Sequence, residues 1–117
     1  MHYADIRRAL LRGNPFCHPS VMLRRRVVLN AGGYLGSLDG EDYDLWSRLA
    51  LDHSLQFANL SESLIGYSAT PIGNARRARS AYAATAAAQW RNFIAGAGLV
   101  WAGAALWTMA KAIVRSR

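Results

Sequence analysis

Apolar positions in residues 1–71 recur with two different spacings. Helical spacing appears within residues 3–12, 24–33 and 41–51, which predicts three short helices. Asn14-Pro15 follows the first and Gly32-Gly33 ends the second, as expected of residues that stop helices. Three short β-prone runs predict strands; they cover residues 19–23, 55–60 and 63–69. Helices mixed with strands indicate an α/β fold for this part of the chain.

The end of the chain follows a different, purely helical pattern. Pro71 and Gly73 mark a boundary, so we expect one unit over residues 1–71 and a helical tail over residues 72–117. The tail begins with an alanine-rich segment that favours a helix. Residues 92–110 then contain no charged side chain, and as one helix they would be about 30 Å long, the thickness of a bilayer core.

Three arrangements stay open for residues 92–110. Their length suits a membrane-spanning helix, and the spacing of Gly98 and Ala102 suits close helix packing. Alanine and glycine contribute little hydrophobicity, however. The segment therefore also fits a helix that lies on a membrane surface or one that packs on a soluble core.

The excess basic charge is confined to the tail. The chain carries 14 Lys and Arg against 7 Asp and Glu, a net charge of +7. All the acidic residues lie before residue 73, where seven arginines balance them, so the excess belongs to residues 73–117. Arginine clusters can bind nucleic-acid phosphates, but no aromatic residues alternate with them as a stacking platform requires. Nucleic acid is therefore disfavoured as a partner, and anionic lipid headgroups fit the tail better.

Cysteine content and the N-terminal sequence bear on location. Cys17 is the only cysteine, which excludes an internal disulfide and is typical of a reducing compartment. The first thirty residues contain no apolar run long enough for a signal peptide. We therefore expect a cytoplasmic protein, membrane-associated if its tail binds lipid.

A group of three acidic residues follows a glycine-rich loop at residues 32–40. Glu41, Asp42 and Asp44 open the predicted helix, where each carboxylate is worth roughly 0.3–1 kcal/mol. Helix capping is thus the simplest role, and Asp44 is spaced for an ion pair with Arg48. The loop suggests a second interpretation. Glycine backbone can approach a ligand closely, and the loop would deliver a carboxylate able to take a proton from a sugar hydroxyl.

The order of these elements resembles the C-terminal half of a family 2 glycosyltransferase over residues 3–71. The chain shows that family's succession of a His-x-Ser element, a Gly-Gly-aromatic turn, a Glu-Asp pair, an Asp-Leu-Trp-x-Arg-Leu helix and a final tyrosine. These elements are His18 and Ser20, Gly32, Gly33 and Tyr34, Glu41 and Asp42, Asp44–Leu49, and Tyr67. The resemblance implies the C-terminal fragment of an α/β nucleotide-diphospho-sugar transferase fold.

The resemblance also implies a reaction. A sugar would pass from a nucleotide-sugar to a hydroxyl of a glycan or lipid-linked acceptor, with inversion at the anomeric carbon. Asp42 would be the general base, a role commonly worth ~10²–10⁴ in rate, and Glu41 would position the acceptor or the base. The pocket near the donor sugar or acceptor would be lined by His18, Ser20, Gly32, Gly33 and Tyr34.

The donor-binding half of the family pattern is not visible in the sequence. In that family an Asp-x-Asp motif holds a divalent metal, Mg²⁺ or Mn²⁺, which neutralises the diphosphate leaving group. The stretch Asp42-Tyr43-Asp44 has this spacing but belongs to the Glu-Asp helix element. We therefore expect a metal in a complete enzyme, none bound by this chain alone, and no activity of the chain by itself. The alternative is a non-catalytic, membrane-associated remnant or a partner-binding module.

Overall fold

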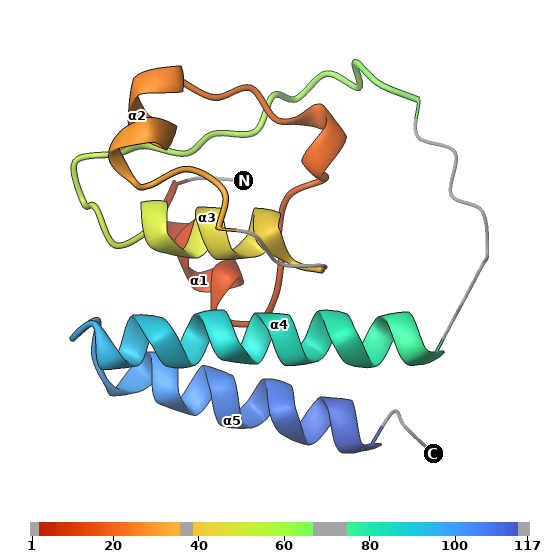
Figure 1. The fold of residues 1–117 in the computed structure, drawn as a ribbon. Helices are drawn as coiled ribbons and strands as arrows, with labels where there is room; N and C mark the ends of the chain where they lie inside the picture. The colour runs from red at the N-terminus through yellow and green to blue at the C-terminus, as the bar shows by residue number, and fades with distance from the viewer. Residues whose placement is uncertain (1–2, 36–38, 67–74, 115–117) are drawn as a thin grey trace.

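A computed structural model describes residues 3–35, 39–66 and 75–114 of the chain (Figure 1). Every regular element within these ranges is a helix. The elements are α1 (Tyr3–Leu10), the short 3₁₀ helix η1 (His18–Ser20), α2 (Arg25–Asn30), α3 (Glu41–Leu49), α4 (Ala75–Ile94) and α5 (Leu99–Val114).

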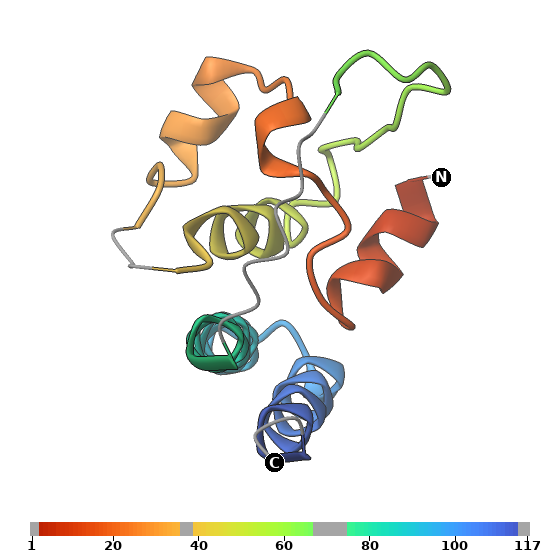
Figure 2. The ribbon, with the colours of Figure 1, turned by 90° about the vertical axis from the view of Figure 1, so that its right-hand side faces the viewer.

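Helix α3 lies at the centre of the arrangement. Figure 1 shows α4 directly beneath α3, with α5 antiparallel to α4 and beneath it. Figure 2, which looks along α4, shows η1 and α2 on the opposite side of α3. The elements that carry the predicted site residues therefore lie on the side of α3 that faces away from the α4–α5 hairpin.

The apolar stripe of α3 forms the middle of the core. Leu45, Trp46 and Leu49 are each at least 96% buried. One residue from each of α1, α4 and α5 belongs to the same buried cluster; these are Leu10, Ala88 and Trp101. A single core thus draws on residues from both sides of the boundary predicted near residue 72.

Gly40, immediately before α3, explains part of the alanine content of α4. Its backbone has a φ of 79°, in the left-handed region that favours glycine. A Cβ at this position would lie 3.0 Å from the Cβ of Ala84 in α4. The close approach of α3 to α4 therefore depends on a glycine on one side and a small side chain on the other.

The α/β fold predicted from the sequence is wrong for the described residues, which contain no strand. The run at residues 19–23 begins in η1 instead, where the Ser20 hydroxyl donates to the carbonyl of Cys17 at 2.7 Å. Residues 55–60 and 63–66 form neither helix nor strand. A β-prone run becomes a strand only beside a partner that completes its hydrogen bonds. The regular elements around these runs are helices, which offer no such edge.

The single helix predicted over residues 92–110 is also wrong. Helix α4 ends at Ile94 and α5 begins at Leu99. Between them Gly96 and Gly98 have φ values of 85° and 100°, which glycine adopts readily, and the chain reverses direction there. Among the helices that the structure describes, none is both long and apolar enough to cross a membrane.

The three short helices predicted before residue 52 are confirmed, with ends that differ by a few residues. The glycine pair ends α2 as expected, because the amide of Gly33 donates to the carbonyl of Val28 at 2.9 Å. Tyr67, Pro71 and Gly73 lie outside the described residues.

Candidate functional site

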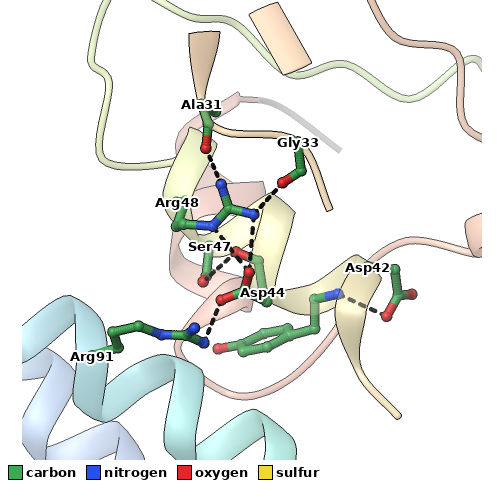
Figure 3. Close-up of polar contacts among 8 residues, drawn as sticks. Ala31, Gly33, Asp42, Asp44, Ser47, Arg48 and Arg91 are labelled. Carbon is green, nitrogen blue, oxygen red and sulfur yellow. Dashed lines mark hydrogen bonds and ion pairs between the residues drawn. The ribbon is translucent and has the colours of Figure 1, made fainter. Parts of the chain in front are cut away.

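Asp44 is the most buried of the three acidic residues that open α3. Its side chain is 7% exposed and pairs with two arginines (Figure 3). Arg48 Nη2 lies 2.9 Å from Asp44 Oδ2, which confirms the predicted pair, and Arg91 of α4 lies 2.5 Å from Oδ1. Two guanidinium groups thus hold the charge of Asp44, and its role is to join α3 to α4.

Arg48 extends this network to the glycine turn that follows α2. Its Nη1 donates to the carbonyl of Ala31 and its Nη2 to that of Gly33 at 2.6 Å (Figure 3). These two carbonyls flank Gly32, so a single planar guanidinium group fixes both sides of the turn. Asp44 thereby positions the turn through Arg48.

Asp42 lies in a different environment from Asp44. Two residues along an α-helix correspond to about 200° of rotation, and Figure 3 shows the Asp42 carboxylate apart from the arginines. Its Oδ2 accepts from the side-chain amide of Asn14 at 2.6 Å, and its Oδ1 from the backbone amide of Tyr43 at 2.7 Å. The N-cap of α3 is Gly40, and Asp42 instead accepts from a backbone amide within the first turn. Each carboxylate oxygen has a second lone pair, however, and the half-buried group can accept further hydrogen bonds.

Two of the predicted pocket residues meet over the ring of Trp46. The Tyr34 hydroxyl and His18 Nε2 are hydrogen bonded at 3.3 Å. Their ring centres lie 6.5 Å and 6.2 Å from that of Trp46, each in an edge-on arrangement. The buried indole N–H of Trp46 has no hydrogen-bond partner in the described part of the chain. Trp46 of α3 thus packs against the rings of both His18 and Tyr34.

The same group is electrostatically connected to the acidic residues. Burial raises the pKa of Tyr34, and the negative charges of Asp42 and then Glu41 raise it further. Tyr34 therefore keeps its proton at neutral pH and can donate a hydrogen bond. Tyr34 is thus hydrogen bonded to His18 and lies within the electrostatic influence of Asp42 and Glu41.

The remaining predicted residues hold the backbone of the site. The Ser20 hydroxyl donates within its own turn, as described above. Gly32 and Gly33 have φ values of 84° and 70°, so they allow the turn that Arg48 binds. Among residues 3–35, 39–66 and 75–114, no three His, Cys, Asp or Glu side chains lie together as a metal site requires.

Two contributors to the site were not predicted from the sequence. The Asn14-Pro15 pair predicts only a helix stop, yet the Asn14 amide orients Asp42 across 28 residues of chain. The charge pattern places Arg91 in a basic tail, yet it pairs with Asp44 across 47 residues. Periodicity reports local neighbours only. The one signal for Arg91 is that residues 73–117 contain no acidic partner for it.

Comparisons with known proteins bear on about half of the chain. The chain is 42% identical over 55 residues to the O-antigen biosynthesis glycosyltransferase WbnJ of Escherichia coli. It is 40% identical over 62 residues to the amylovoran biosynthesis glycosyltransferase AmsE of Erwinia amylovora. These matches cover 46% and 52% of this chain. About half of the chain is similar in sequence to glycosyltransferases.

The matches cover only a small part of each relative. The chain spans only 22% and 23% of the two relatives, so it corresponds to less than a quarter of either protein. No protein-family model and no solved structure matches the chain. The similarity supports a glycosyltransferase. It leaves the type of glycosyltransferase, the sugar and the acceptor to be argued from the site.

Proposed function

We propose that this chain forms the acceptor side of an inverting, family 2 type glycosyltransferase, with Asp42 as the general base. The observation that carries the proposal is the separation of the two aspartates. Asp44 is held by two arginines, whereas Asp42 has acceptor capacity left and its charge raises the pKa of Tyr34, the partner of His18. The similarity to two glycosyltransferases supports the same conclusion.

The proposed step starts from an acceptor hydroxyl, which is a poor nucleophile until its proton is removed. Asp42 takes that proton as the hydroxyl oxygen forms a bond to the anomeric carbon of the donor sugar. The bond from this carbon to the diphosphate breaks at the same time, and the nucleoside diphosphate leaves with the electron pair. Attack from the face opposite the leaving group inverts the configuration, and a positioned carboxylate is commonly worth ~10²–10⁴ in rate.

Neighbouring residues prepare Asp42 for this step. Asn14 donates to Oδ2 and the Tyr43 amide to Oδ1, which together fix the plane of the carboxylate. Both donors are neutral, so they orient the Asp42 carboxylate without forming an ion pair with it. Asp44, in contrast, forms ion pairs with two arginines. Glu41 adds a second negative charge beside the site, in a position to orient the acceptor.

His18 and Tyr34, supported from below by the buried Trp46, form the wall against which a sugar would lie. A sugar ring carries both C–H faces and hydroxyl groups, so it matches aromatic surfaces bordered by polar groups. The protonated Tyr34 hydroxyl would donate a hydrogen bond to the substrate. Arg48 would maintain the wall by holding the Ala31–Gly33 turn in place.

The rest of the reaction belongs to a complete enzyme. We propose that the nucleotide-sugar binds to a segment outside the described residues, and that the acceptor is a glycan or a lipid-linked sugar. The divalent metal expected for such an enzyme stays a prediction, as does the cytoplasmic location. On this proposal the chain alone catalyses no transfer.

A chimera tests the proposal. The full chain, which keeps the α4–α5 hairpin and Arg91, would replace the segment of the O-antigen glycosyltransferase WbnJ that it matches, and sugar transfer would be measured. We expect the chimera to be active and Asp42→Asn to lower turnover by more than about tenfold. Asp52→Asn is the matched control, because Asp52 is an exposed acid of the same segment. Equal turnover of the Asp42→Asn and Asp52→Asn chimeras would refute the role of Asp42.

A further inference from the structure

The outer face of α5 is an exposed apolar stripe. Three pairs of large apolar residues recur at intervals of seven positions, which is about two turns of helix, so they share one face. Every member is more than half exposed; the pairs are Leu99 and Val100, Leu106 and Trp107, and Ile113 and Val114. We call these six residues the α5 stripe. No charged residue interrupts it, because Lys111 is the only charged residue of α5.

The opposite face of α5 is also apolar and is already used. Trp101, Ala104 and Ala105 are buried in the hairpin, together with Thr108. A helix that is apolar all round is normally covered on every side. In α5 only the inner side is covered, so the α5 stripe is expected to be covered by a membrane or by another protein surface.

We propose that the α5 stripe lies in the surface of a bilayer that contains anionic lipid. Residues 73–117 carry seven basic residues and no acidic one, which favours an anionic surface. A second copy of the chain would bring two such basic segments together, and their like charges would oppose the contact. Charge therefore selects the membrane over the dimer as the occupant.

The dimensions of α5 suit a helix that lies in the interface. Its 16 residues correspond to a helix about 24 Å long. A helix that spans the bilayer core needs roughly 20 residues, or about 30 Å. The Nζ of Lys111 lies 6.0 Å from the centre of the Trp107 ring, so a basic group stands beside an aromatic one. Tryptophan favours the headgroup region, which suits the exposed Trp107.

The orientation leaves the proposed site accessible. Figures 1 and 2 show α5 as the outermost layer on one side of the molecule, with η1 and α2 on the opposite side of α3. A membrane against α5 would therefore not cover His18 or Tyr34. The inference does not depend on the proposed transferase activity, and each can fail without the other.

Vesicle sedimentation of the purified full chain tests the inference. We would compare vesicles of phosphatidylcholine alone with vesicles of equal parts phosphatidylcholine and phosphatidylglycerol. We expect sedimentation with the mixed vesicles, much less with the neutral ones, and release as salt is raised, because salt screens the attraction. The double variant Leu99→Gln and Leu106→Gln should bind the mixed vesicles at least about tenfold more weakly, because it removes two leucines that the membrane would bury.

Leu60→Gln with Leu64→Gln is the matched control. These leucines are 72% and 71% exposed, comparable with 80% and 60% for Leu99 and Leu106, but they lie outside α5. The control should bind mixed vesicles like the unaltered chain, and circular dichroism should show both variants helical. A chain that stays in solution with both vesicle types would overturn the inference, as would equal loss in the two variants. A dimer in sedimentation velocity that only the α5 variant dissociates would assign the stripe to a second copy.

Discussion

Two aspartates separated by one residue have different tasks because of helix geometry. The rotation of about 100° per residue points Asp44 toward Arg48 and Arg91 and leaves Asp42 beside Asn14. The partners of Asp44 are charged and hold its charge in the core, whereas those of Asp42 are neutral. The environments of the two carboxylates thus depend in part on partners that lie far away in the sequence, Asn14 and Arg91.

The titration of Tyr34 tests this placement at the level of single residues. Burial raises its pKa first, and the charges of Asp42 and Glu41 add to the effect. Asp42→Asn removes one negative charge, so the pKa of Tyr34 should fall toward that of free tyrosine without reaching it. Ultraviolet difference titration against Tyr34→Phe would isolate this tyrosine. Asp52→Asn should leave the pKa unchanged; a Tyr34 pKa equally insensitive to Asp42→Asn would place Asp42 away from the site.

At the level of elements, helices could be predicted and strands could not. The signals for α1, α2 and α3 are local, since a helix satisfies its own hydrogen bonds and its stops are adjacent residues. The runs at residues 55–60 and 63–66 have the composition of strands, but strand formation depends on a partner that local sequence does not reveal. The role of Asn14 could not be predicted, because its contact with Asp42 is tertiary.

Gly40 offers a test of how α3 is seated on α4. Gly40→Ala should destabilise the chain by about 1–3 kcal/mol, because a Cβ there meets Ala84 at 3.0 Å and adds to the cost of a positive φ. Gly33→Ala is the matched control: its φ of 70° is similar, but nothing lies within 4 Å of the added Cβ. Urea unfolding would measure both.

The difference between these two variants isolates the contact with α4. We expect Gly40→Ala to cost about 1 kcal/mol more than Gly33→Ala, and Ala84→Gly in the Gly40→Ala background to reduce that excess. The same cost in both variants would mean that backbone conformation alone requires Gly40.

At the level of the whole molecule, the α4–α5 hairpin contributes residues to the core. Ala88 and Trp101 belong to the same buried cluster as Leu10 and Trp46. Arg91 reaches Asp44, and the buried Gln89 donates to the carbonyl of Leu11 at 3.2 Å. The alanines of this segment favour a helix. Its position against the rest of the fold depends on contacts between residues far apart in the sequence, such as Leu11 and Gln89, which periodicity cannot detect.

Asp44→Asn tests whether this connection stabilises the fold. The change leaves Arg48 largely buried without its carboxylate, and we expect a loss of about 2–4 kcal/mol in the free energy of unfolding. The lower part of this range applies if solvent screens Arg91, whose side chain is 49% exposed. Asp5→Asn removes an exposed pair with Arg8 and should cost less than about 0.5 kcal/mol. Similar unfolding curves for the two variants would show that the buried network contributes no stability.

The turnover number of the Asp42→Asn chimera, measured beside its affinity for the nucleotide-sugar, tests the central claim most directly. We expect turnover to fall by more than about tenfold, because a proton acceptor is lost. Donor affinity and the urea midpoint should stay close to those of the unaltered chimera, because Asp44 keeps both of its arginines. Unchanged turnover would contradict the claim, and so would a fall in turnover that merely follows a loss of folding.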